Sequence, residues 1–109
     1  MRDTEDRFRD ILEAIVRIEK YTQAGRVSFD QDELIQTWVI HHLEIIGEAA
    51  RAIPKEERLL HPEIPWNQIS GMRNILIHMY FGIDRDVVWT VVVRELPSLK
   101  LAVESILNK

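Results

Sequence analysis

The sequence predicts an all-α protein, an antiparallel up-down bundle of about four main helices. Apolar residues recur at spacings of three and four over most of the chain, which is the period of an amphipathic helix. Gly25, Pro54, Pro65 and Gly82 lie between these periodic stretches and mark the ends of helices. The connections are short, so helices that follow each other in sequence are expected to pack side by side.

The first helix is expected from Thr4 to about Ala24. Gly25 then supplies a left-handed stop, because glycine adopts positive φ angles without strain. The apolar stripe of this helix comprises Phe8, Ile11, Leu12, Ile15, Ile18 and Tyr21.

The second helix is expected to be capped by Asp30 and to run to about Ile53, where Pro54 ends it. Small residues at 47, 49 and 50 leave room for another helix to approach closely. The predicted buried side comprises Leu34, Ile35, Trp38, Val39, Leu43, Ile46, Ala49 and Ala50.

Residues 55–65 form a connector that allows one short helical turn, because Pro62 and Pro65 break anything longer. Pro65 can open a third helix, where its missing N–H group costs nothing, and Gly82 ends that helix. Its apolar positions are Trp66, Ile69, Met72, Leu76 and Met79.

The last helix is expected from Arg85 to about Leu107, capped by Asp84. Residues 87–93 have the composition of a strand, but a lone strand would have no partner in a helical chain. Pro97 predicts a kink or a restart near Leu96. The inward positions are Val88, Trp89, Val92, Leu96, Leu99, Val103 and Ile106.

With 109 residues, the chain is expected to form one domain, residues 1–109, and to associate as a homodimer. The reason for a dimer is apolar surface that lies off the helical stripes and that a small monomer would expose to water. These additional apolar residues are Ile45, Ile75, Ile77, Val87, Val91 and Val93.

The composition favours a cytoplasmic protein. It has no cysteine, which excludes disulfides and thiolate metal sites, and its charged start and short apolar runs give no secretory signal or membrane span. The net charge of -4 argues against a general nucleic-acid coat protein, since such proteins neutralise many phosphates. Any contact with RNA should therefore be local, or made by a partner.

Residues 73–80 carry an RxxxxHxY pattern with Arg73, His78 and Tyr80. Arginine offers a permanent positive charge and a planar fork of donors that suits phosphate oxygens, while histidine can move a proton near neutral pH. Together these groups supply the minimum for cleaving an RNA phosphodiester without a metal or other cofactor. His78 would move the protons and Arg73 would stabilise the charge, giving a 2′,3′-cyclic phosphate, with Asn74 and Tyr80 in supporting roles.

Helix geometry places Arg73 and Tyr80 on one stripe and His78 about 140° away from Arg73. The two catalytic candidates can therefore meet at one phosphate only if the arginine bends across, the helix distorts, or a second subunit completes the site. We expect the octet at a helix end that opens into a cleft at the dimer interface.

Two other classes of function remain open. The first is a non-catalytic helical dimer that binds a nucleotide or a protein partner, which the family resemblance given below would make a nucleotidyltransferase. The second is a metal site within the bundle, built from His41, His42, Glu44 and Glu48, although the chain lacks the matching ligands that such sites take from several helices. Glu48 is better explained as a partner of an arginine near the cleft.

The stretch 63–74 followed by 78–84 resembles the central block of the HepT-like toxins, a branch of the HEPN ribonucleases. Residues 45–50, 88–89 and 96–97 also match that family, so the resemblance covers nearly the whole chain. The wider HEPN pattern is satisfied by the arginine, asparagine and histidine of the octet. Met79 departs from the family, which commonly has a small or polar residue before the tyrosine.

The resemblance implies a HEPN-like fold and a toxin of a two-gene, type VII-like toxin-antitoxin system. In such systems the antitoxin is a minimal nucleotidyltransferase, which can neutralise the toxin by adding AMP to the tyrosine of the motif. Tyr80 is the matching residue. An anionic adduct there would lie on the stripe of Arg73 and satisfy that cation with the wrong phosphate.

Overall fold

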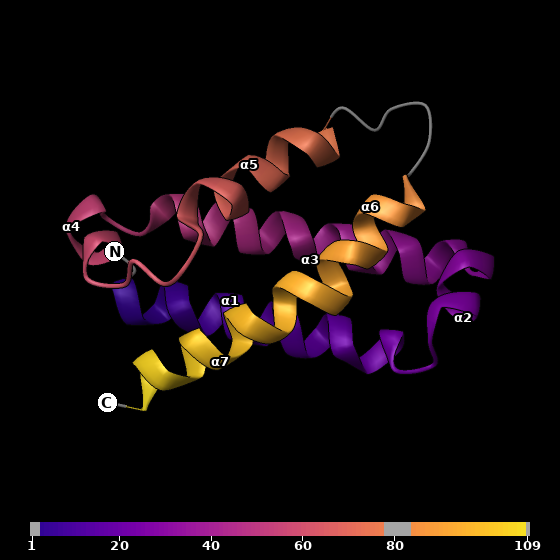
Figure 1. The fold of residues 1–109 in the computed structure, drawn as a ribbon, viewed down its shortest axis with the longest axis horizontal. Helices are drawn as coiled ribbons and strands as arrows, with labels where there is room; N and C mark the ends of the chain where they lie inside the picture. The colour runs from indigo at the N-terminus through magenta and orange to yellow at the C-terminus, as the bar shows by residue number, and fades with distance from the viewer. Residues whose placement is uncertain (1–2, 78–83, 109) are drawn as a thin grey trace.

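The computed structural model describes residues 3–77 and 84–108, and for residues 72–77 it describes the backbone alone. Helix α1 (Thr4–Thr22) runs antiparallel to α3 (Glu33–Ala52), and α5 (Trp66–Ile77) packs on α3 (Figure 1). The chain then returns along α1 through α6 (Arg85–Thr90), the π-helical turn η1 (Val91–Glu95) and α7 (Leu96–Leu107). The described residues contain no strand, which confirms the all-α, up-down bundle.

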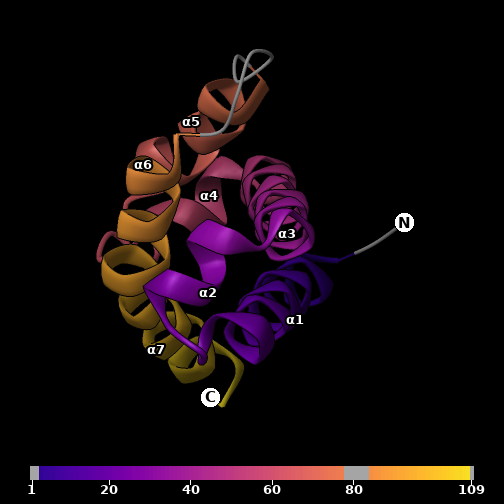
Figure 2. The same ribbon diagram turned by 90° about the vertical axis from the view of Figure 1, so that its right-hand side faces the viewer.

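Two short helices complete the described chain. Helix α2 (Arg26–Gln31) lies across one end of the bundle, which faces the viewer in Figure 2. Helix α4 (Lys55–Leu59) is the short turn that the connector was expected to allow. Between α1 and α2, Gly25 has the predicted positive φ, +97°, but it is the N-cap of α2, because α1 has already ended at Thr22 with Gln23 as its C-cap.

The predicted start of the second long helix is wrong. Asp32, not Asp30, caps α3, because its Oδ1 atom accepts from the backbone N–H groups of Leu34 at 2.9 Å and Ile35 at 3.3 Å. Asp30 belongs to α2, a helix that was not expected from the sequence. The later start leaves Leu34 on the outside, 81% exposed instead of buried.

The first and last predicted helices agree closely with the structure. Helix α1 ends at Thr22, two residues before the predicted end, and its Tyr21 is 42% exposed rather than buried. Helix α7 begins at Leu96, the predicted restart, with Pro97 in its first turn. The N–H group of Leu96 donates to the carbonyl of Val91, five residues earlier, so the turn just before the proline is π-helical.

The core lies where α1, α3 and the α6–α7 segment meet. Phe8, Ile15 and Ile46 are among its fully buried side chains, and Phe29 of α2 closes one end of it. Further buried members are Ile11, Ile18, Val39, Leu43, Ile53, Ile64, Ile69, Val88, Leu96, Leu99 and Val103.

Several large apolar side chains are exposed. Of those expected to favour a dimer, Val87 and Val93 are 41% and 49% exposed, whereas Ile45 and Val91 are partly buried against the core. Ile75 and Ile77 have side chains outside the described set. The homodimer stays a prediction. Within the described ranges, no helix combines the length and the apolar character needed to cross a bilayer.

Candidate active site

Helix α5 carries the first half of the RxxxxHxY octet, and its start is firmly held. The indole Nε1 of Trp66 donates to the carbonyl oxygens of Arg58 at 3.1 Å and His61 at 3.0 Å. The Trp66 ring also meets Phe8 of α1 edge to face at 6.1 Å between centroids, and Ile69 is buried. These contacts fix the helix on which Arg73 and Asn74 lie.

Helix α5 packs against α3 (Figure 1). Gly47, Ala49 and Ala50 of α3 are buried. The predicted close approach of two helices is consistent with this arrangement. The backbone of Arg73 and Asn74 is helical, but their side chains, and His78 and Tyr80 altogether, lie outside the described residues. Their predicted convergence stays a prediction.

Glu48 lies on the exposed side of α3. Its Oε1 atom is 4.0 Å from Nη1 of Arg51, one turn further along the same helix. The predicted pairing of Glu48 with an arginine of the octet concerns a side chain outside the described set and is not tested. Its place on the helix that α5 packs against is compatible with that role.

The neighbouring histidines differ in their surroundings. His42 is buried, its Nδ1 lies 2.8 Å from the carbonyl oxygen of Trp38, and its ring packs on the indole of Trp38 at 4.4 Å. Because a carbonyl only accepts, Nδ1 must carry the proton. His41 is exposed beside a groove of about 370 Å³ between α1 and α3. No group of three or more His, Asp or Glu side chains in the described part of the chain is arranged to hold a metal.

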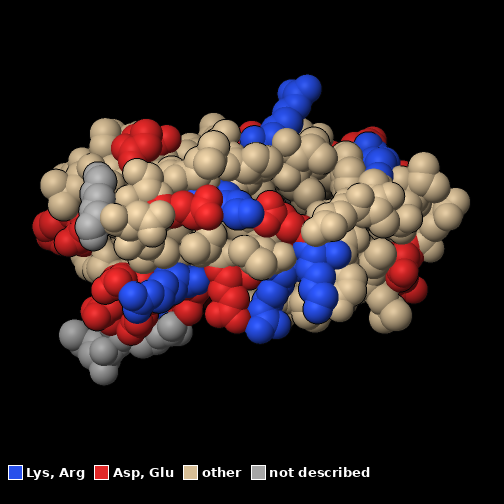
Figure 3. All heavy atoms as spheres, turned by 90° about the horizontal axis from the view of Figure 1, so that it is seen from below, with Lys and Arg blue, Asp and Glu red and all other residues tan. Residues whose placement is uncertain are grey.

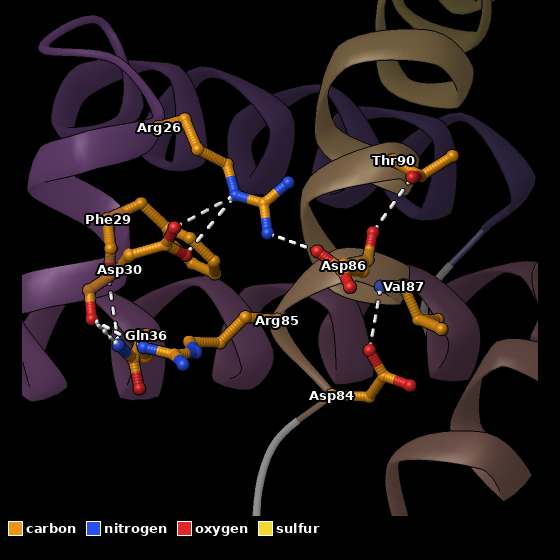
Figure 4. A network of polar contacts seen from close by, with 9 residues as sticks. All are labelled: Arg26, Phe29, Asp30, Gln36, Asp84, Arg85, Asp86, Val87 and Thr90. Atoms are coloured by element: carbon orange, nitrogen blue, oxygen red, sulfur yellow. Dashed lines mark hydrogen bonds and ion pairs between the residues drawn. The ribbon is translucent and has the colours of Figure 1, made fainter.

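On the C-terminal side of the octet lies α6, whose start is held by a cluster that the sequence did not predict. Asp84 caps the helix by accepting from the N–H group of Val87 at 3.1 Å. Arg26 of α2 pairs with both Asp30 and Asp86 (Figure 4). The Arg26–Asp30 spacing of four on one helix was a visible signal, but the partner on α6 is sixty residues away.

We call Arg26, Asp30, Arg85 and Asp86 the Arg26 network. The hydrogen bond from Arg26 holds the pKa of Asp86 below its usual value. The hydrogen bonds to Asp86 and Asp30 raise the pKa of Arg26 above its usual value. Both directions favour the charged forms, so the network is an ion-paired cluster at neutral pH.

The surface charges are mixed. Seen from below, acidic and basic side chains lie close together rather than in a patch of one sign (Figure 3). This face therefore shows no broad patch of positive charge of the kind that a general nucleic-acid coat protein uses to neutralise many phosphates.

Comparison with known proteins assigns the family. The family described as Ribonuclease HepT-like matches residues 11–106. The chain belongs to the HepT-like ribonuclease family. Among curated relatives of this HepT-like chain, a probable ribonuclease HepT of Thermococcus cleftensis is 46% identical over 102 residues, which covers 91% of each chain.

Two further relatives of the HepT-like chain carry names of the same kind. A putative RNase of Caldanaerobacter subterraneus is 39% identical over 84% of this chain and 82% of its own length. A putative RNase of Methanocaldococcus jannaschii is 40% identical over 94% of this chain and 95% of its own length. No solved structure matches the chain significantly.

Proposed function

We propose that this HepT-like chain is a metal-independent endoribonuclease and the toxin component of a type VII-like toxin-antitoxin system. The observation that carries the proposal is the octet 73–80, with Arg73 and His78, in a chain that belongs to the HepT-like family. The names of the relatives, which include a probable ribonuclease, support RNA as the substrate. We further propose that residues 1–109 act as one domain.

The proposed reaction uses the RNA's own 2′-hydroxyl as the nucleophile. A new bond forms between the 2′-oxygen and phosphorus, and the bond from phosphorus to the 5′-oxygen breaks, which leaves a 2′,3′-cyclic phosphate. His78 moves the protons from the attacking hydroxyl and to the leaving oxygen, and Arg73 stabilises the charge that builds on the phosphate oxygens. Asn74 orients a phosphate oxygen, and Tyr80 donates a hydrogen bond or stacks on a base.

A homodimer is part of the proposal because Arg73 and His78 would lie on different sides of a regular helix. A second subunit at the cleft would complete the site. An apolar groove of about 240 Å³ between the start of α5 and the η1–α7 segment, together with exposed Val93, provides surface that a second copy could cover. Glu48 would hold an arginine of the cleft.

The proposed regulation is AMP addition at Tyr80 by a minimal nucleotidyltransferase antitoxin. An AMP group brings negative charge and a phosphate to the stripe of Arg73. That phosphate would occupy the cation and block the RNA, which is a sufficient physical reason for neutralisation.

The activity is tested with purified protein treated with EDTA and a labelled RNA. We expect the parent to cut the RNA, and we expect His78→Ala and Arg73→Ala to reduce kcat by about 100-fold or more. The matched controls are His41→Ala, at an exposed histidine, and Arg9→Ala, at an exposed arginine of α1, and both should retain activity.

Two outcomes would contradict the proposed catalytic residues and favour the non-catalytic binding dimer. These are an inactive parent and cleavage that persists in both catalytic variants. Activity that EDTA removes would instead contradict metal independence.

The regulatory site is tested by expressing the toxin together with a nucleotidyltransferase and ATP and measuring intact masses. The parent should gain the mass of AMP, whereas Tyr80→Phe should not, while retaining much of its ribonuclease activity. The chain has two tyrosines, so Tyr21→Phe is the matched control and should still be modified. An AMP adduct on the Tyr80→Phe variant would refute the assignment.

A further inference from the structure

Arg26 joins two helices that are distant in sequence. Its Nε atom donates to both carboxylate oxygens of Asp30, at 3.2 and 3.1 Å, one turn further along α2. Its Nη2 atom donates to Oδ1 of Asp86 on α6. One guanidinium therefore binds two carboxylates in directions that its planar fork favours, which a lysine could not reproduce.

Further hydrogen bonds and a ring contact join α2 to α3 and to α6. The backbone carbonyl of Asp30 accepts from Arg85 at 2.9 Å and from the side-chain amide of Gln36 at 3.1 Å (Figure 4). Phe29 is fully buried and lies 5.3 Å from the ring of Trp89 between centroids. The short helix α2 thus connects α3 with the first turns of α6.

Three consecutive residues at the start of α6 are held in this way. Asp84 caps the helix, Arg85 binds the end of α2, and Asp86 binds Arg26. They follow directly on the segment 78–83, which carries His78 and Tyr80. In the sequence this segment is preceded by α5, which is held in place by Trp66 and Ile69.

Resting on the proposed ribonuclease function, we propose that Arg26 is a positioning residue for RNA cleavage. By binding Asp30 and Asp86 together, it fixes the point at which the chain enters α6 and so the distance that the segment with His78 must span. A general acid or base works only within hydrogen-bond reach of its proton, and a displacement of about 1 Å can cost a large factor in rate.

A positioning role can be separated from a purely structural one, because Asp86 is largely exposed. Exposed ion pairs contribute little to global stability. Loss of Arg26 should therefore leave the overall unfolding transition nearly unchanged while altering the local geometry at α6. Glu13 and Arg17 of α1 form an exposed ion pair with the same spacing of four as Arg26 and Asp30. Because this pair lies on another helix, it provides a matched control.

The test compares kcat and KM for RNA cleavage in Arg26→Ala, Asp86→Ala, the double variant and Arg17→Ala. For both single variants we expect kcat to fall about tenfold with KM within about twofold, because binding is retained while orientation is lost. The double variant should be no worse than Arg26→Ala, since Arg26→Ala already removes the bond to Asp86. Arg17→Ala should match the parent.

Hydrogen exchange gives a readout that does not depend on activity. The N–H groups of Val87 and Val88 are bonded to Asp84 at the start of α6 and should exchange faster in Arg26→Ala, with the amides of α1 unchanged. Equal kcat in Arg26→Ala and the parent would overturn the positioning role and leave the ribonuclease intact. A parent that cuts no RNA would overturn both proposals.

Discussion

Asp32 shows how one side chain sets the start of a helix. Its carboxylate accepts from two backbone N–H groups of α3 that have no partner within the helix, and its extended backbone turns the chain out of α2. Asp30, two residues earlier, uses its carboxylate for Arg26. Chemically identical residues thus have different roles, which are decided by where the backbone donors lie.

We expect Asp32→Ala to lower the free energy of unfolding by about 1 kcal/mol, since it removes an N-cap. Asp32→Asn should retain most of the stability because its amide oxygen can still accept. Urea denaturation followed by circular dichroism measures both. Glu33→Ala, in the first turn of the same helix but not at the cap position, serves as the control. Equal losses at 32 and 33 would contradict the capping role.

The sequence predicted which residues form the candidate site, but not which side chains pack around the others. The RxxxxHxY spacing is visible in the sequence, as is the helical period that places Arg73 on α5. His42 lies three residues after Val39 on the apolar stripe of α3 and is buried, whereas His41 lies off that stripe and is exposed. The helical period distinguishes the two, but the ring of Trp38 against which His42 packs is seen only in the structure.

At the level of elements, the four long helical stretches followed from apolar periodicity, whereas α2 did not. It has six residues and one buried side chain, Phe29, so it has too few turns to show a period. The strand-like run 87–93 is helical, as argued from the lack of a partner, and the effect of Pro97 appears in η1, the turn before it. The proline ring would collide with the carbonyl four residues earlier in an α-helix, and the wider π turn avoids this.

The contact between α2 and α6 should depend on pH in the acid range. The folded state lowers the pKa of Asp86, chiefly through the hydrogen bond from Arg26 and also through the charges of Arg26 and Arg85. A lowered carboxyl pKa contributes stability that is present above the unfolded-state value and is lost as the pH falls through the folded-state value.

We therefore expect the α6 amides to exchange more slowly in the parent than in Asp86→Asn at neutral pH, and this difference should vanish in strong acid. Hydrogen exchange at a series of pH values, corrected for intrinsic rates, checks this outcome. A difference that persists unchanged below the lowered pKa would show that the carboxylate charge is not responsible.

At the scale of the whole molecule, the bundle depends on the contacts of α1 with α3 and α7. Ile15 lies in this core and is fully buried, while its neighbour Val16 is 48% exposed. The order and direction of the long helices could be predicted because short connections force antiparallel neighbours. The Arg26 network could not, because its partners approach only after the chain has closed on itself.

Ile15→Ala should lower the free energy of unfolding by about 2–5 kcal/mol, because it removes buried methylene and methyl groups and leaves a cavity. Val16→Ala should change it by no more than about 0.5 kcal/mol. Chemical denaturation measures both variants, with one m value, the slope of unfolding free energy against denaturant concentration, used for all proteins. A loss at Val16 as large as the loss at Ile15 would mean that the outer face of α1 is covered in solution.

Gly25 has a further consequence for how this protein can vary. Its φ of +97° and ψ of 179° fall in a region that is essentially restricted to glycine. Any side chain there would strain the bend that delivers Arg26 to its two carboxylates, although a Cβ atom would meet no other atom within 4 Å. Substitution at this one position would therefore loosen the start of α6 from a distance, without changing any residue of α5 or of α6.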